Sequence, residues 1–234
     1  MVEGNAIIGF FPANSKGDDI YIFENDNREK IIETFSMLRQ QTSKPKDKYN
    51  LCLADFIAPI KSNIKDYMGF FAVTTGLNIE KQLVEFEQQH DDYSSIMLKA
   101  LADRLAESFA EHLHLQVRKI FWSYAQDESL NNEDLIAEKY AGIRPAPGYP
   151  ACPDHTEKIT LFRLLEVTKH TNIFLTENLA MLPASSVSGF YFSHPASYYF
   201  GIGKIGKDQL KDYALRKQID ISLLLRSLSM HLND

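Results

Sequence analysis

Gly142-Ile-Arg-Pro-Ala-Pro-Gly-Tyr-Pro-Ala-Cys-Pro-Asp-His-Thr-Glu-Lys158 is the stretch around which the rest of the chain is arranged. Its four prolines remove four backbone N–H donors and push each preceding residue toward an extended conformation. Neither a helix nor a central strand can form here. The stretch is therefore predicted to be an extended surface segment with polyproline-like character, whose carbonyl groups face water or a ligand.

Arg144 and Tyr149 are the side chains of this stretch that suit a small ligand. The planar guanidinium of Arg144 matches a carboxylate, and five residues later Tyr149 adds an aromatic face with a hydroxyl. This pairing suggests a site for a small zwitterion or acid. On composition alone the alternative is a proline-stiffened connector in which Arg144 caps a helix end.

Several motifs together resemble one known family. The run Arg144–Tyr149, followed by Pro-Ala-Cys-Pro-Asp-His-Thr-Glu-Lys158, resembles the reactivation domain of cobalamin-dependent methionine synthase, where an Arg-x-x-x-Gly-Tyr motif binds S-adenosylmethionine. Further segments of the chain look like the same family: Gly9–Asn14, Gln89–Tyr93, Lys99–Glu107 and Val187–Pro195. The resemblance covers nearly the whole chain.

The family's domain begins well upstream of the segment that matches Gly9–Asn14. The upstream portion carries an aspartate thought to meet the α-amino group of the methyl donor. We therefore expect residues 1–234 to form a single S-adenosylmethionine-binding activation domain that lacks the family's N-terminal portion.

The resemblance also implies a set of donor-binding residues. Arg144 would take the methionyl carboxylate of S-adenosylmethionine, while Tyr199 and Phe200 would line its adenosyl side. Ala146 would supply backbone contacts, and Glu138 would be a polar neighbour of the sulfonium. Without the resemblance, the aromatic run at 198–200 is equally a strand that presents its rings to a core.

Two further roles follow from the resemblance. Tyr149 would stand over the upper face of the corrin ring of cobalamin. Asp103 and Glu107 would receive the histidine that leaves cobalt when the enzyme enters its reactivation state. The residues themselves leave an alternative open for these acids, namely a solvated helix face relieved by Lys99, Arg104 and His114.

The activity implied is the reactivation of methionine synthase. S-adenosylmethionine would be the methyl donor for reductive methylation of oxidised cob(II)alamin to methylcobalamin, so the chain would be an enzyme as part of methionine synthase. A cobalamin-binding domain or chain would supply cobalamin, and a flavodoxin-like protein or an equivalent reductase would supply the electron. Two alternatives remain: a non-catalytic docking module for a cobalamin-carrying partner, with an incomplete donor site, and a free-standing small-molecule methyltransferase.

Other chemistry has little support in the motifs. Cys152 and His155 have metal-ligand spacing, but no second pair recurs, and His112 and His114 lie two residues apart on a predicted helix. Gly201-Ile-Gly203 lacks the third glycine of a dinucleotide-binding loop. The spacing therefore gives no reason to expect a metal site. By the resemblance, no catalytic acid or base is expected either, because a sulfonium is already an activated methyl donor.

Composition bounds the class of protein. The net charge of −6 is spread through 234 residues without a basic block, which argues against a nucleic-acid partner. No apolar run approaches the roughly 20 residues of a membrane span, so no membrane partner is expected. Only two cysteines occur, far apart, which indicates reduced thiols and a cytoplasmic location.

The coarse pattern has strands, then long helices, then strands and helices again, which predicts an α+β fold on an antiparallel or mixed sheet. The resemblance implies a curved, largely antiparallel sheet flanked by helices. Residues 29–41 are ambiguous between strand and helix. Strands are expected at 6–11, 20–23, 51–57, 68–75, 187–192 and 198–205, and helices at 78–125, 132–140, 156–168, 207–217 and 221–230, the last capped by Asp220.

The longest predicted helix has a wide apolar stripe. Its members recur every four residues and comprise Met97, Leu101, Leu105, Phe109, Leu113 and Val117, joined by Leu98, Ala102, Ala106 and Ala110. We expect this stripe to be buried and the ladder of Asp103, Glu107 and Glu111 to lie on a different face.

Overall fold

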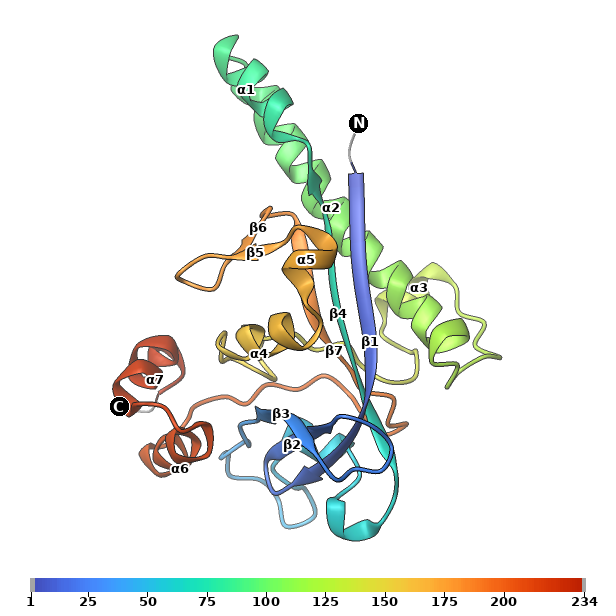
Figure 1. The fold of residues 1–234 in the computed structure, drawn as a ribbon, viewed down its shortest axis with the longest axis vertical. Coiled ribbons are helices and arrows are strands. Elements are labelled where there is room, and N and C mark those ends of the chain that lie inside the picture. The colour runs from blue at the N-terminus through green and yellow to red at the C-terminus, as the bar shows by residue number, and fades with distance from the viewer. Residues whose placement is uncertain (1–2, 233–234) are drawn as a thin grey trace. The chain divides into compact units, whose positions relative to one another are not determined.

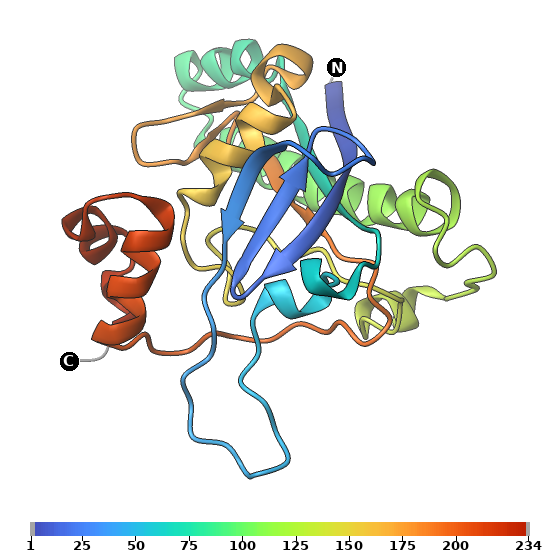
Figure 2. The same ribbon diagram turned by 60° about the horizontal axis from the view of Figure 1, so that its bottom comes forward.

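The computed structural model describes residues 3–232 and contains a five-stranded sheet in the order β3-β2-β1-β4-β7 (Figure 1). β1 pairs antiparallel with β2, and β2 pairs antiparallel with β3, as the blue arrows of Figure 2 show. The strands are β1 (Glu3–Lys16), β2 (Asp19–Phe23), β3 (Ile31–Ser36), β4 (Asp66–Leu77) and β7 (Ser186–Tyr191), with a separate antiparallel pair, β5 (Phe174–Leu175) and β6 (Met181–Leu182). The predicted α+β fold with an antiparallel sheet flanked by helices is confirmed.

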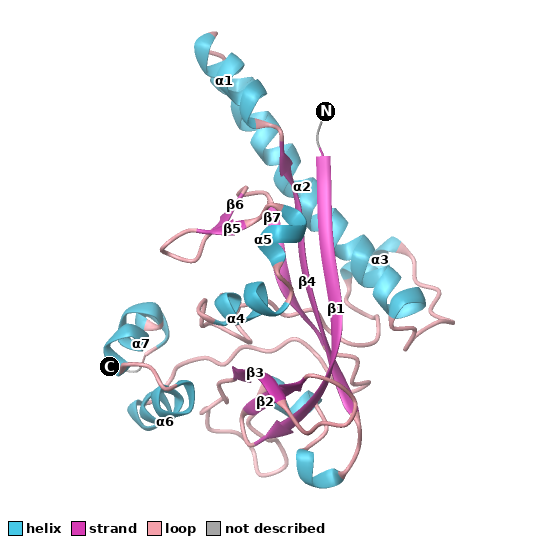
Figure 3. Cartoon of the chain, in the orientation of Figure 1, coloured by secondary structure: helices cyan, strands magenta, loops and turns pink. Residues whose placement is uncertain are grey.

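The α-helices, drawn in cyan in Figure 3, lie between β4 and β5 and after β7 in the chain. The α-helices are α1 (Glu80–Gln88), α2 (Asp92–Gln116), α3 (Asn132–Ile136), α4 (Glu157–Leu164), α5 (Val167–Thr171), α6 (Lys207–Lys217) and α7 (Ile221–Ser227). Short 3-10 turns occur at Leu53–Phe56, Ile60–Ser62 and Ser229–His231, and α2 runs into a π-helical turn at Val117–Phe121. No helix among residues 3–232 is long and apolar enough to cross a membrane.

The chain divides into two compact units. The first comprises Met1–Gly9, Phe70–Glu128 and Leu161–Gly189, and the second comprises Phe10–Gly69, Ser129–Thr160 and Phe190–Asp234. The first therefore holds α1 and α2, and the second holds the proline-rich stretch and α6. One activation domain over residues 1–234 stays a prediction.

In the first unit, α2 buries the small residues of the predicted stripe, whereas several of its large residues stay exposed. Ala102, Ala106 and Ala110 are at most 1% exposed, whereas Leu101 and Leu105 are about half exposed. Thr75 of β4 donates its hydroxyl to the carbonyl of Ala102 at 2.7 Å. A helix backbone can come this close to a strand only where its side chains are small, so the prediction that Met97, Leu101 and Leu105 are buried was wrong.

The helix predicted at 78–125 is broken into two. His90 has a left-handed φ of +54°, which ends α1, and Asp91 then caps α2 by accepting the backbone N–H of Ser94 at 3.0 Å. An aspartate at this position satisfies a free N–H of the first turn, so it starts a helix instead of continuing one.

The second unit buries aromatic strand residues and, separately, a cluster at its C-terminal helices. Phe35 of β3 packs edge-on against Phe190 of β7, with ring centroids 5.4 Å apart. At Gly69 of β4 an added Cβ would lie 2.9 Å from Cβ of Tyr191, which explains the glycine at this close approach. A further buried cluster combines Leu38, which follows β3, with residues at and around α6 and α7: Ile202, Ile205, Leu210, Tyr213, Ala214, Leu224 and Leu228.

Two predicted strands are not strands. Residues 51–57 contain the 3-10 turn Leu53–Phe56, because Asp55 accepts the N–H of Cys52 at 2.9 Å and so closes a turn. Residues 198–204 have no strand pairing and follow β7 as loop in Figure 3, and Ile205 forms an isolated bridge with Leu232. Single buried side chains such as Leu53 and Ile202, rather than sheet pairing, account for the apolar residues of both segments.

Other boundaries are shorter than predicted. Residues 37–41 are not helical, so the ambiguity at 29–41 is resolved as a strand, β3. Left-handed residues end two of the helices early, Glu138 after α3 and Glu166 after α4. The predicted cap at Asp220 is confirmed, because its carboxylate accepts the N–H of Ser222 at 2.7 Å.

Candidate functional site

The proline-rich stretch folds into a hydrogen-bonded turn over residues 146–152, which we call the proline turn. The N–H of Gly148 donates to the carbonyl of Cys152 at 2.7 Å, and the N–H of Cys152 donates to the carbonyl of Tyr149 at 2.9 Å. The N–H of Tyr149 donates to the carbonyl of Ala146 at 3.1 Å. The prolines leave few N–H groups, and the turn pairs three of those that remain.

Gly148 is required by the geometry of this turn. Its φ is +96°, and a Cβ added there would lie 2.2 Å from Cε1 of His155. The imidazole of His155 therefore covers the backbone at Gly148. Partial burial, together with the neighbouring charge of Lys158, holds the pKa of His155 below its usual value.

Arg144 lies just before the turn, among tyrosines. Its backbone N–H donates to the hydroxyl of Tyr199 at 3.0 Å, and that hydroxyl lies 3.0 Å from the hydroxyl of Tyr140. The guanidinium donates to Tyr140 at 3.2 Å and lies 5.8 Å from the centre of its ring. The tyrosines orient a partly exposed cation, which is the arrangement that a carboxylate ligand needs.

Backbone hydrogen bonds hold the start of the stretch. Ile143 and Phe192 exchange N–H···O bonds of 3.0 Å in both directions, and the N–H of Phe190 donates to the carbonyl of Pro145 at 2.9 Å. Further on, the N–H of Ile202 donates to the carbonyl of Pro150 at 2.8 Å. The stretch is thus fixed along the end of β7 and the segment that follows it.

The other residues expected at the donor site have different surroundings. Phe200 follows Tyr199 but packs on Phe56, with ring centroids 6.1 Å apart. Ala146 is buried at the start of the proline turn, whereas Tyr149 is 58% exposed. Glu138 lies beyond the end of α3 with an exposed side chain. Tyr199 thus contacts Arg144 directly, whereas Phe200 packs on Phe56.

Asp103 and Glu107 belong to the first unit. They lie one turn apart on α2 with exposed side chains, and Asp103 accepts the hydroxyl of Ser185 at 2.7 Å. The structure therefore presents two carboxylates on a rigid helix, as the sequence predicted.

Sequence reasoning missed Tyr140, which contacts both Arg144 and Tyr199. Its signal was its place four residues before Arg144, at the end of the predicted helix at 132–140. Lys217 and Tyr213 of α6 were also missed, although both contact the acidic residues that follow the proline turn. They lie some 60 residues away in sequence, so no local pattern relates them to the turn.

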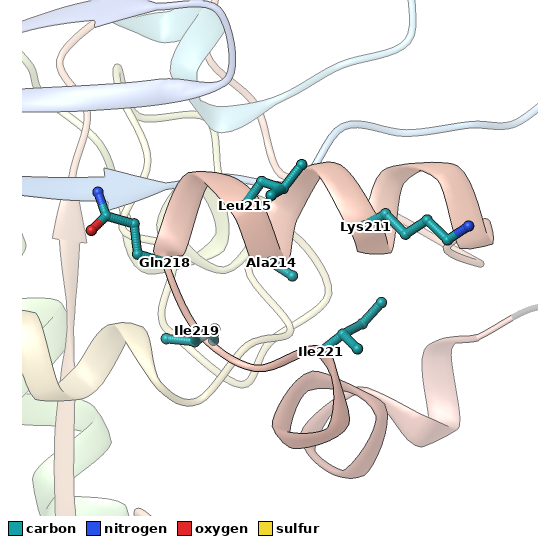
Figure 4. A pocket seen from close by; sticks show the side chains of 6 residues that line it. All are labelled: Lys211, Ala214, Leu215, Gln218, Ile219 and Ile221. Atoms are coloured by element: carbon teal, nitrogen blue, oxygen red, sulfur yellow. The ribbon is translucent and has the colours of Figure 1, made fainter.

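An apolar groove of about 560 Å³ lies along α6, and Figure 4 shows its lining residues. They are Lys211, Ala214, Leu215, Gln218, Ile219 and Ile221. The groove has one charged side chain and does not include Arg144, so it lacks the polar groups that would orient a zwitterion.

The described residues hold no group of three or more histidine, cysteine or acidic side chains arranged for a metal ion. Cys52 and Cys152 are free thiols, and both are buried.

Comparison with known proteins agrees with this architecture. The sequence model of the family described as "Vitamin B12 dependent methionine synthase, activation domain" matches residues 1–218. The chain is also similar to a solved structure described as "Crystal Structure of the MetH Reactivation Domain bound to AdoHcy", with 54% sequence identity and a TM-score of 0.97. That alignment covers 100% of this chain and 71% of the other. The predicted resemblance is thereby confirmed, and the chain belongs to the activation-domain family of vitamin B12-dependent methionine synthase.

Proposed function

We propose that this chain binds S-adenosylmethionine through the proline turn and Arg144, and that it serves the reductive methylation of cobalamin within methionine synthase. The observation that carries the proposal is the guanidinium of Arg144, which donates a hydrogen bond to Tyr140. It lies next to a turn in which the backbone at Gly148 is in close contact with the ring of His155. The relative of 54% identity, whose description names bound AdoHcy, supports a ligand of this chemical class.

The residues present fit such a ligand. S-adenosylmethionine has a carboxylate, which suits the fork of Arg144, and an adenine ring, which suits an aromatic wall at Tyr199. The exposed ring of Tyr149 would face cobalamin. Glu138 and Ala146 would contribute an acidic neighbour for the sulfonium and a backbone contact, respectively.

The residues of this chain would act by positioning. Cobalamin, carried by another domain or chain, supplies the cobalt that accepts the methyl group. Arg144 would hold one end of the donor, the proline turn would hold its middle, and Tyr149 would help to exclude water from the reacting groups. No residue needs to gain or lose a proton, so no catalytic acid or base is assigned. A flavodoxin-like or equivalent reductase would provide the electron.

Isothermal calorimetry with S-adenosylmethionine tests the site. Arg144→Ala should weaken binding by about 2 kcal/mol, or roughly thirty-fold, because a charge-assisted contact to the carboxylate is lost. Arg226→Ala is the matched control, since Arg226 is an exposed arginine on α7 of the same unit. Equal heats for wild type and Arg144→Ala would contradict the carboxylate assignment.

The acidic pair on α2 supports a second role, docking of a cobalamin-carrying partner. Asp103 and Glu107 would receive an imidazolium from that partner, because adjacent carboxylates favour its charged form. Glu107→Lys should abolish capture of a cobalamin-loaded domain, whereas Glu133→Lys on α3 should not. If capture persists with Glu107→Lys while S-adenosylmethionine still binds, this docking role is wrong and the donor site stands.

The two buried free thiols support a cytoplasmic location for the protein.

A further inference from the structure

A buried ionic cluster lies just beyond the proline turn, in the same unit. Lys217 is the last residue of α6, and its Nζ lies 3.0 Å from Oδ2 of Asp154 and 2.7 Å from Oγ1 of Thr156. The same ammonium contacts Oε1 of Glu157. The side chains of Asp154 and Glu157 are 1% and 2% exposed. The three donors of the lysine are thus all used on residues that directly follow the turn.

Tyr213 and Cys152 complete the surroundings of this cluster. The hydroxyl of Tyr213 lies one helical turn before Lys217 and donates to Asp154 at 2.8 Å, with a longer contact of 3.3 Å to Glu157. The thiol of Cys152 is buried beside the same carboxylates, and burial raises its pKa well above the usual value. Glu157 therefore faces one cation, one other carboxylate, a phenol and a thiol.

The cluster anchors one end of the proline turn. Asp154 follows Cys152 by two residues, and the backbone of Cys152 closes the turn on both Gly148 and Tyr149. The other end is held at Ile143 and Pro145 by backbone hydrogen bonds, which do not titrate. The anchor at Asp154, by contrast, depends on an ion pair.

We propose that Lys217 is a positioning residue for the donor site: by holding Asp154 and Glu157, it fixes the C-terminal end of the proline turn. This inference rests on the proposed function for its consequence in binding. Removing the ammonium would leave two carboxylates buried without a counter-ion, and such groups recover water by moving outward. The segment after Cys152 would then loosen, and the turn would lose its hydrogen-bonded shape.

The anchor is expected to weaken as pH rises. Burial raises the pKa of Glu157 to about 7, although Lys217 opposes this shift. Between its ordinary value of 4.5 and about 7, the folded chain keeps a proton that the unfolded chain has lost. Stability therefore falls as pH rises through this window, and above it one ammonium must serve two carboxylates.

Amide hydrogen exchange of the protein without ligand tests the anchor directly. In Lys217→Met the amides of Gly148 and Cys152 should exchange at least about ten-fold faster than in wild type, while those of Ile143 and Phe192 stay unchanged. Lys211→Met is the matched control, because Lys211 is an exposed lysine on the same helix. Unchanged exchange at Gly148 and Cys152 in a folded Lys217→Met protein would overturn the proposal.

If Lys217→Met does not fold, Glu157→Gln tests whether the ionic cluster anchors the proline turn. This variant keeps the Asp154–Lys217 pair but removes the carboxyl group of Glu157, which titrates. From about pH 6 to about pH 8, exchange at Gly148 relative to Ile143 should rise several-fold in wild type and stay level in Glu157→Gln. The same rise in both proteins would overturn the proposal. If exchange behaves as expected but wild type binds no S-adenosylmethionine, the anchor stands and the proposed function fails.

Discussion

The hydroxyl of Tyr199 accepts the backbone N–H of Arg144 at 3.0 Å, although 55 residues separate them in the sequence. This bond holds the main chain at the residue whose side chain is proposed to bind the donor carboxylate. The Tyr199 hydroxyl also lies 3.0 Å from that of Tyr140, so the two tyrosines and Arg144 form one hydrogen-bonded cluster.

Removing this hydroxyl should weaken the donor site without unfolding the protein. Tyr199→Phe leaves the N–H of Arg144 without its acceptor and takes a partner from Tyr140, at a cost of about 1–2 kcal/mol. Calorimetry should show S-adenosylmethionine binding about ten-fold more weakly. Tyr198→Phe is the control, because Tyr198 is 55% exposed. An affinity equal to that of wild type would show that Tyr199 does not orient Arg144.

Gly148→Ala should destabilise the protein and weaken the site. A side chain at φ +96° is strained, and the new methyl would also meet the ring of His155 at 2.2 Å. A cost of about 1–3 kcal/mol is expected from the backbone alone. Thermal denaturation measures it, with Gly201→Ala as control, where the added Cβ meets Pro150 at an ordinary 3.5 Å. If Gly148→Ala/His155→Ala restores full stability, the clash and not the backbone strain is the cause.

Local chemistry made part of this site predictable. The prolines predict an extended surface segment, but this prediction was wrong, because residues 146–152 form a hydrogen-bonded turn and Ala151 and Cys152 are buried. The motif resemblance adds Tyr199 from a distant part of the chain. Tyr213 and Lys217 lie outside the reach of such reasoning, because a buried ion pair depends on how α6 packs and not on any periodic pattern. The same limit explains residues 198–204, where apolar side chains pack without strand pairing.

The two cysteines should be unreactive in the folded protein. Burial raises the pKa of both thiols, and Cys52 is 0% and Cys152 4% exposed. Because the thiolate is the reactive form, alkylation by iodoacetamide at neutral pH should be roughly a hundred-fold slower than in urea. Mass spectrometry of the two peptides measures the rates. Fast labelling of Cys152 in the native protein would mean that the proline turn opens readily.

The buried pair of Arg118 and Glu128 should contribute strongly to the stability of the first unit. The Arg118 side chain is 0% exposed, and its Nε and Nη2 lie 2.9 and 2.8 Å from Oε1 of Glu128. Glu128→Ala would leave a buried guanidinium without this partner, at a cost of about 3–5 kcal/mol. Asp127→Ala, an exposed acid beside it, should change the free energy of unfolding by less than about 0.5 kcal/mol. Equal urea midpoints for the two variants would contradict this role.

The packing of α2 gives the last prediction, because hydrophobicity alone did not distinguish the small residues of the predicted stripe, which are buried, from several large ones, which are not. Ala106 is 1% exposed while Leu105 is 47% exposed, so the larger apolar side chain lies outside and the smaller one inside. Ala106→Leu should therefore overpack the first unit and cost about 1–3 kcal/mol, whereas Leu105→Ala should cost less than about 1 kcal/mol. Urea denaturation with both variants measures the difference. A greater loss of unfolding free energy for Leu105→Ala than for Ala106→Leu would contradict this packing. It would mean that Leu105 is on the buried face and that Ala106 has room for a larger side chain.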